Sequence, residues 1–213
     1  MSRPKGPTIN LSSASPCGRR GRHGRGLFGR RLLVGLVLSS LAFRAGVSAQ
    51  PAEADASAIE AAMLRNFARY VTWPPSAFQS DHSPWRLCVL GPDPFGALLE
   101  RTVGGRSEQG RSFSVVRASD PAALTACHIV FIAATETRKR RAALAAWKGL
   151  PILTVSDAPD FLQEGGAIRL DVSDRVELSV NLDQARSLAL KVQTKLLEVA
   201  REVLDNGSLR RRP

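Results

Sequence analysis

One short stretch, residues 128–133, decides the fold class: it reads His128-Ile-Val-Phe-Ile-Ala133. After its first residue the stretch is wholly apolar, which is typical of a strand buried on both faces of a parallel sheet. Three more strands are expected, over 87–90, 112–116 and 151–155, together with helices over 94–103 and 136–147. This alternation predicts an α/β fold with a single three-layer domain, in which a mostly parallel sheet carries helices on both faces.

The flanking segments complete this expectation. Ser57 is expected to cap a first helix that ends before Pro74-Pro75, and Thr135 to cap the helix over 136–147. The runs 167–170 and 176–180, on either side of Ser173-Asp174, predict an antiparallel hairpin at the edge of the sheet. Asn181 is expected to begin a long helix that reaches Leu204 and ends at Asn206-Gly207.

The first 49 residues are interpreted as a signal peptide. They hold nine of the 30 Lys and Arg residues, no Asp or Glu, and an apolar run from Leu32 to Phe43. That run reaches only about 18 Å as a helix, against a membrane core of about 30 Å, which favours a cleaved signal over an anchor. The small residues of Val47-Ser48-Ala49 predict cleavage near Ala49. The pair Arg30-Arg31 leaves open whether export follows the general or the twin-arginine route.

The rest of the chain is expected to form a flexible N-terminus (50–57), one α/β domain (58–205) and a basic tail (206–213). Residues 50–213 hold 21 basic and 19 acidic residues, a net charge of only +2. This balance excludes a basic nucleic-acid-binding domain. No later apolar run reaches 18 residues, so no transmembrane segment is expected in the mature chain.

Few residues in the sequence point to catalysis. His82 and His128 are the only histidines after residue 49, and the chain has no Gly-x-Ser-x-Gly motif. Cys88 and Cys127 favour a disulfide in an exported chain, with free thiols and a metal site as alternatives. The adjacent Cys127-His128 is poor spacing for two ligands of one tetrahedral ion. We therefore expect no catalytic residue, no metal site and no cofactor.

A small-ligand pocket is one candidate site. Open α/β sheets bind ligands at the carboxyl ends of their strands, where Asp93, Glu136, Ser156 and Asp157 are expected. Capping and turn roles explain these four residues equally well.

A partner interface is the other candidate site. Tyr70 and Trp73 lie where the first helix ends, beside a rigid Pro-Pro step, and large aromatic side chains are typical interface anchors. Leu190, Leu197 and Leu204 would form one edge of the long last helix. The alternative is that Trp73 fills one end of the core and that the last helix is packed between two neighbours.

Seven segments form an ordered set that spans from about Ser57 to Val203. They read Ala61-Ala-Met-Leu-Arg-Asn-Phe-Ala-Arg-Tyr-Val-Thr-Trp-Pro74, Leu87-Cys-Val-Leu-Gly-Pro-Asp-Pro-Phe-Gly96, Cys127-His-Ile-Val-Phe-Ile132, Leu153-Thr-Val-Ser-Asp157, Gly165-Gly-Ala-Ile-Arg-Leu170, Val180-Asn-Leu182 and Lys195-Leu-Leu197. Together they resemble the YfiR family of exported bacterial proteins.

The resemblance implies a periplasmic, non-enzymatic regulator. Such a protein represses a membrane diguanylate cyclase by acting on its periplasmic sensor domain, which modulates cyclic-di-GMP signalling and biofilm formation. The resemblance also implies a homodimer and an outer-membrane lipoprotein that sequesters the repressor. Cys88 and Cys127 match a cysteine pair of the family, whereas a second pair that some members carry near 161–169 is absent here. A periplasmic small-ligand-binding protein is the alternative function.

Overall fold

The structure is a computed structural model that describes residues 51–173 and 175–212, with side chains from Asp55 onward. The expected signal peptide, 1–49, lies outside these residues. The helices are α1 (Pro51–Tyr70), α2 (Leu98–Val103), α3 (Thr137–Ala146), α4 (Leu182–Ser187) and α5 (Thr194–Val199), with short 3-10 turns η1 (Pro75–Ala77) and η2 (Pro121–Leu124). Within the described part of the chain, no helix is both long and apolar enough to cross a membrane.

Nine strands form one sheet in the order β11-β10-β8-β7-β6-β5-β2-β4-β3. Their bounds are β2 (Trp85–Leu90), β3 (Ser107–Glu108), β4 (Arg111–Ala118), β5 (Ile129–Ile132), β6 (Leu153–Ser156), β7 (Ile168–Val172), β8 (Val176–Asn181), β10 (Glu202–Asp205) and β11 (Ser208–Arg211). The central run β4-β2-β5-β6-β7 is parallel throughout. A separate two-stranded sheet pairs β1 (Val71–Thr72) with β9 (Lys191–Val192).

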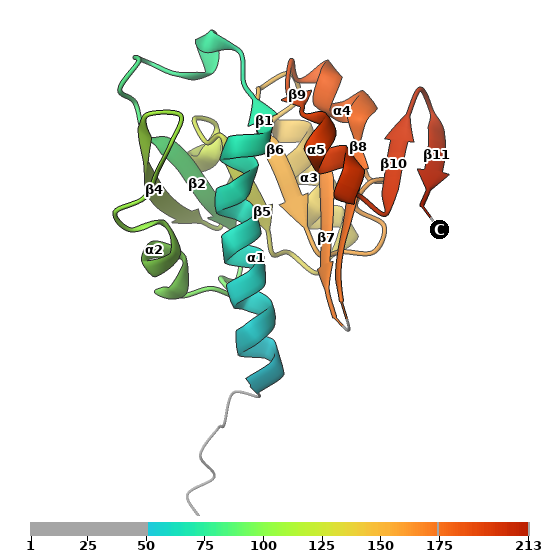
Figure 1. The fold of residues 1–213 in the computed structure, drawn as a ribbon, viewed down its shortest axis with the longest axis horizontal. Helices are drawn as coiled ribbons and strands as arrows, with labels where there is room; N and C mark the ends of the chain where they lie inside the picture. Colours follow the sequence, from blue (N-terminus) through green and yellow to red (C-terminus); the bar gives the residue numbers. More distant parts are fainter. Residues whose placement is uncertain (1–50, 174, 213) are drawn as a thin grey trace, which may run out of the picture. The chain divides into compact units, whose positions relative to one another are not determined.

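The domain has three layers, because each central strand buries side chains on both faces. Along β5, Ile129 and Phe131 belong to one core cluster, whereas Val130 and Ile132 belong to the other. This is the two-residue alternation of a strand covered on both sides. The first cluster also contains residues of α1, α2, α4 and α5, and the second contains residues of α3. Figure 1 shows α1 and α5 in front of the sheet and α3 behind it.

The predicted α/β fold is confirmed. The four strands expected over 87–90, 112–116, 128–133 and 151–155 are β2, β4, β5 and β6, and the expected hairpin is the antiparallel pair β7–β8. That hairpin is not at the edge of the sheet, since β8 also pairs with β10. One edge is the antiparallel hairpin β10–β11, whose outer strand overlaps the expected basic tail, 206–213, and the other edge is β3.

The long helix expected from Asn181 to Leu204 is wrong. Asn181 does cap a helix, since its side chain accepts a hydrogen bond from the Gln184 N–H, but α4 ends at Ser187. Ala189 has a φ of 56°, in the left-handed region, and the Leu190 N–H donates to the Ala185 carbonyl. This is a Schellman-type helix end, usually made by glycine, so an alanine there gives no sequence signal.

Two expected helix caps are also wrong. Helix α1 begins at Pro51, so Ser57 lies inside it, and the expected flexible segment 50–57 overlaps its first turns. Helix α3 begins at Thr137, with Glu136 rather than Thr135 at the N-cap position and no side-chain capping hydrogen bond.

Candidate partner-binding surface and candidate ligand pocket

The end of α1 is fixed to the C-terminal half of the domain. Val71 and Thr72 pair with Val192 and Lys191 of β9, and the Gln193 N–H donates to the Tyr70 carbonyl over 2.9 Å. This pairing joins segments that are far apart in the sequence. Tyr70, Leu190 and Leu197 therefore pack on the same core cluster.

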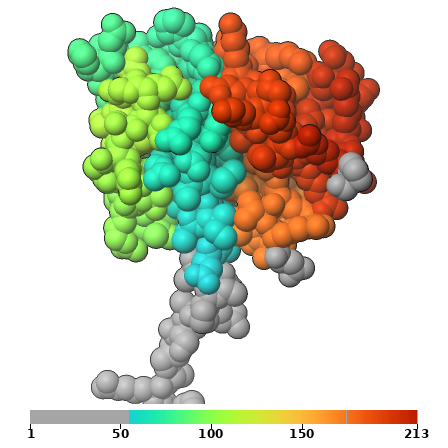
Figure 2. All heavy atoms as spheres, in the orientation of Figure 1, coloured from blue at the N-terminus to red at the C-terminus, as the bar shows by residue number. Residues whose placement is uncertain are grey.

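An apolar groove lies between α1 and α5 beside Tyr70. Its volume is about 470 Å³, and its lining residues are Met63, Asn66, Phe67, Tyr70, Lys195, Leu196, Glu198 and Val199. Val199 is 67% exposed, the most exposed large apolar side chain in the described residues. Figure 2 shows α1 and the C-terminal elements side by side on this face. The groove is therefore a candidate surface for an apolar segment of a partner.

The other expected interface residues are only partly brought together. Trp73 is 5% exposed and packs against Trp85 with ring centroids 4.9 Å apart, as a core residue does. Leu190 is also buried, at 2% exposure, whereas Leu197 is half-buried on α5. Leu204 lies on β10, so Leu190, Leu197 and Leu204 do not form one helix edge. Whether any of the five contacts a partner remains a prediction.

His128 is held by contacts on both ring nitrogens. Its Nδ1 accepts a hydrogen bond from the Arg86 N–H over 2.9 Å, and its Nε2 lies 3.1 Å from the Ala77 carbonyl oxygen, so Nε2 carries the proton. The ring stacks on Phe78 at 4.4 Å. Burial lowers the pKa of His128, and the nearby Arg111 and Arg86 lower it further. The imidazole is neutral and joins η1 to the sheet.

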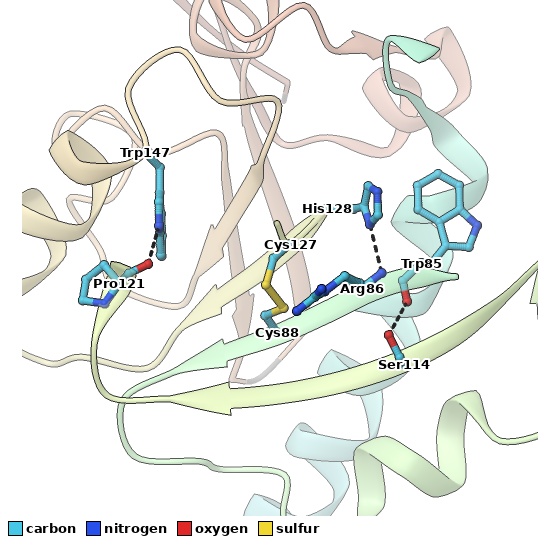
Figure 3. Close-up of a disulfide and its surroundings, with 8 residues drawn as sticks. All are labelled: Trp85, Arg86, Cys88, Ser114, Pro121, Cys127, His128 and Trp147. Atoms are coloured by element: carbon cyan, nitrogen blue, oxygen red, sulfur yellow. Dashed lines mark hydrogen bonds between the residues drawn. A yellow bond between two sulfur atoms is a disulfide. The ribbon is translucent and has the colours of Figure 1, made fainter. Parts of the chain in front are cut away.

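The predicted disulfide between Cys88 and Cys127 is confirmed. Figure 3 shows it beside His128 and Arg86. Cys88 lies on β2, and Cys127 comes just before the neighbouring β5, with Cα atoms 6.2 Å apart. Both residues belong to the core cluster on the α3 face. The bond therefore links the two strands at the centre of the sheet.

A second hollow lies at the carboxyl ends of β2 and β5. The chain leaves β2 for β4 on one side and returns to β5 on the other, which makes this point the topological switch of the sheet. Such crevices are the usual ligand sites of open α/β sheets. The hollow has a volume of about 680 Å³ and is lined by Leu90, Gly91, Pro92, Ser119, Pro121, Ala134, Thr135, Glu136, Lys139 and Ala142.

Of the four residues expected in such a pocket, only Glu136 lines it. Asp93 pairs with Arg117 over 2.5 Å and accepts the Phe95 N–H, so it holds the turn before α2. Ser156 is fully buried and donates to the Ile132 carbonyl over 2.8 Å. Asp157 is exposed after β6, near Glu60 of α1. Binding of a ligand remains a prediction.

One residue of the basic run Arg138-Lys139-Arg140-Arg141 is buried and has a structural role. Arg140 is buried and holds Glu164 with two hydrogen bonds, of 2.7 and 2.5 Å. It also donates to the carbonyls of Ala134 and Thr135. The Arg140 guanidinium lowers the pKa of Glu164. Sequence alone does not distinguish this buried arginine from its exposed neighbours, because its partner lies 24 positions away.

Comparison with known protein families agrees with these elements and their order. The matching family model is described as YfiR/HmsC-like, and the match covers residues 57–201, from the first turns of α1 to the residue before β10. The disulfide, both core clusters and the groove between α1 and α5 lie within the matched residues. The chain therefore belongs to the YfiR/HmsC-like family.

Proposed function

We propose that this protein is a non-enzymatic periplasmic regulator that binds and represses the periplasmic sensor domain of a membrane diguanylate cyclase. Family membership over residues 57–201 is the observation that carries the proposal. The apolar groove between α1 and α5 is the proposed contact surface. The proposal includes cleavage of the signal peptide near Ala49, a homodimer, and sequestration by an outer-membrane lipoprotein.

The chemistry of the histidines supports a role without catalysis. Both ring nitrogens of His128 are engaged by backbone groups, so the ring is not placed to exchange a proton with a substrate. His82 lies on an exposed turn between η1 and β2, away from the apolar groove and from the hollow at the switch point.

The groove supports binding of a protein segment rather than of a polar metabolite. Apolar side chains form most of its wall, and Lys195 and Glu198 stand at its rim with opposite charges. An apolar centre with a polar rim is the usual composition of a protein interface. Tyr70 contributes the large side chain that such interfaces use as an anchor.

The test is gene deletion with complementation in the bacterium that carries this gene. Deletion should raise cellular cyclic-di-GMP, and the wild-type gene should restore it. Tyr70→Ala should fail to restore it, whereas Leu144→Ala, a matched truncation of a half-buried side chain on α3, should restore it. Equal melting temperatures of the two purified variants would exclude misfolding as the cause. Unchanged cyclic-di-GMP and biofilm after deletion, under every condition tried, would overturn the assignment.

The hollow at the switch point supports a second function, binding of a small ligand. Its volume of about 680 Å³ lies in the range that holds small organic ligands. Native mass spectrometry of protein purified from the periplasm should then show a retained small molecule. Ala142→Trp should remove that molecule by filling the hollow, with Tyr70→Ala as the control that leaves it bound. Protein that carries no molecule from several growth media would exclude this function.

A further inference from the structure

The hairpin β10–β11 lies beyond the residues that match the family. The match ends at Arg201, and the hairpin covers 202–211. Its turn is Asn206-Gly207, with φ angles of 50° and 70°, which is the two-residue turn of type I′. Two residues of α4 hold this turn. Arg186 donates to the Asp205 carboxylate, and the Asp183 carboxylate accepts hydrogen bonds from the N–H groups of Asn206 and Gly207. The hairpin is therefore docked on the domain.

Strand β11 leaves one row of backbone groups without a strand neighbour. Among the strands that the structure describes, β11 pairs with β10 alone. Asp205 and Ser208 flank the two-residue turn and therefore form a hydrogen-bonded pair. Because such pairs alternate along an antiparallel ladder, the N–H and C=O groups of Leu209 and Arg211 face away from β10. They can accept another strand.

A basic hollow adjoins the end of this strand. It has a volume of about 280 Å³ and is lined by Arg175, Val176, Glu177, Val199, Ala200, Arg201 and Arg212. Arg175 and Arg201 both pair with the same oxygen of Glu177. Three guanidinium groups against one carboxylate leave a net charge of +2 at the hollow. Val176 and Val199, which are 47% and 67% exposed, supply apolar surface beside the charge.

We propose that β11 and this basic hollow bind an extended acidic segment of a partner protein, which adds a strand at the edge of the sheet and places a carboxylate between Arg175 and Arg212. Strand addition uses main-chain hydrogen bonds for affinity and side-chain pockets for specificity. A carboxylate matches the fork of a guanidinium, and the two valines fit an aliphatic neighbour on the same segment. The proposal does not depend on the partner being a cyclase.

The charges on β11 argue against other occupants. A second copy paired edge to edge through β11 would bring Arg210, Arg211 and Arg212 of both copies together, which is repulsive. An anionic membrane surface would engage protruding side chains and would make no use of a concave site or of the outward backbone groups. An extended acidic chain uses the arginine side chains, the concave site and the outward backbone groups together.

The experiment measures fluorescence polarisation of a short labelled peptide of alternating Glu and Val with the protein comprising residues 50–213. Arg175→Gln with Arg212→Gln should weaken binding about tenfold, and the matched pair Arg138→Gln with Arg141→Gln on α3 should leave it unchanged. A peptide with Gln in place of Glu should bind weakly. N-methylation of alternate peptide nitrogens should remove binding, because it deletes the donors of the added strand.

Leu209→Pro tests the strand edge from the protein side. It deletes an N–H that faces away from β10, so the hairpin keeps its own ladder and the melting temperature should stay close to wild type. The same substitution should weaken peptide binding. Equal binding of the methylated peptide, equal binding by both arginine pairs, or a dimer that Leu209→Pro dissociates would each overturn the proposal. Stronger arginine-dependent binding of anionic vesicles or inorganic phosphate than of the peptide would also overturn it.

Discussion

Glu60 makes the stability of this domain depend on pH in an unusual direction. The side chain lies on α1 and is only 9% exposed. Burial, with the negative charges of Asp157 and Asp171 nearby, raises its pKa from 4.5 to about 7. The folded protein therefore holds this proton over a pH range in which the unfolded chain has released it.

The sign and size of the effect follow from proton linkage. Between pH 4.5 and 7 the folded state binds more protons at this site, so its free energy of unfolding falls as the pH rises. The shift corresponds to about 3 kcal/mol above pH 7, as an upper value, and to none below pH 4. Replacement of the carboxyl by an amide, Glu60→Gln, should stabilise the protein at pH 8 by up to that amount and leave its stability unchanged at pH 4.

Urea denaturation at a series of pH values is the assay. The pKa of His128 is lowered, which makes stability rise with pH and opposes the effect of Glu60, so the informative quantity is the difference between variant and wild type. Glu198→Gln, on the exposed surface of α5, is the matched control for the substitution itself. A difference for Glu60→Gln that is the same at pH 4 and pH 8 would refute the reasoning.

Three further perturbations have defined outcomes. Cys88→Ser with Cys127→Ser should lower the free energy of unfolding by about 4 kcal/mol in the loop-entropy model, measured by denaturant titration; no change would mean that the bond is absent in the native protein. Trp73→Ala should cost about 3–5 kcal/mol in the same titration, because it opens a cavity against Trp85; an unchanged midpoint with lost repression would move Trp73 to an interface. Arg140→Ala should cost about 3–5 kcal/mol by leaving Glu164 buried without its partner, and a thermal melt equal to wild type would contradict this.

The centre of the fold was predictable because its signal is local. The β2 and β5 runs, Leu87 to Leu90 and Ile129 to Ile132, are apolar at every position, which only a sheet covered on both faces requires. The disulfide was predictable because residues 50–213, the part of the chain expected to be exported, hold two cysteines.

The segment after Asn181 was mispredicted for an equally physical reason. Apolar residues at 188–204 satisfy a helical period, and the helix end at Ala189 lacks the expected glycine. What breaks the helix is tertiary: β9 pairs with β1, and β10 pairs with β8. One local signal was present, since Asn206-Gly207 is the strongest short hairpin signature, and it was interpreted as a helix end.

The groove and the switch-point hollow depend on contacts that sequence spacing does not give. Tyr70 and Val199 line one groove although they lie far apart in the chain. Asp93 was expected in a ligand pocket, but Arg117 and the Phe95 N–H engage it instead. Polar residues at strand ends serve turns and ligands with the same chemistry, so only the folded neighbourhood separates the two roles.

The position of the disulfide also determines what a protease can release. The longest run of exposed residues between the two cysteines is Gly104 to Ser107, and a cut after Arg106 would place Cys88 in one fragment and Cys127 in the other. The fragments would stay covalently joined, with β2 still packed between β4 and β5. A nicked molecule would therefore run as one band on a denaturing gel until a reductant is added. In an oxidising compartment its two fragments would remain linked.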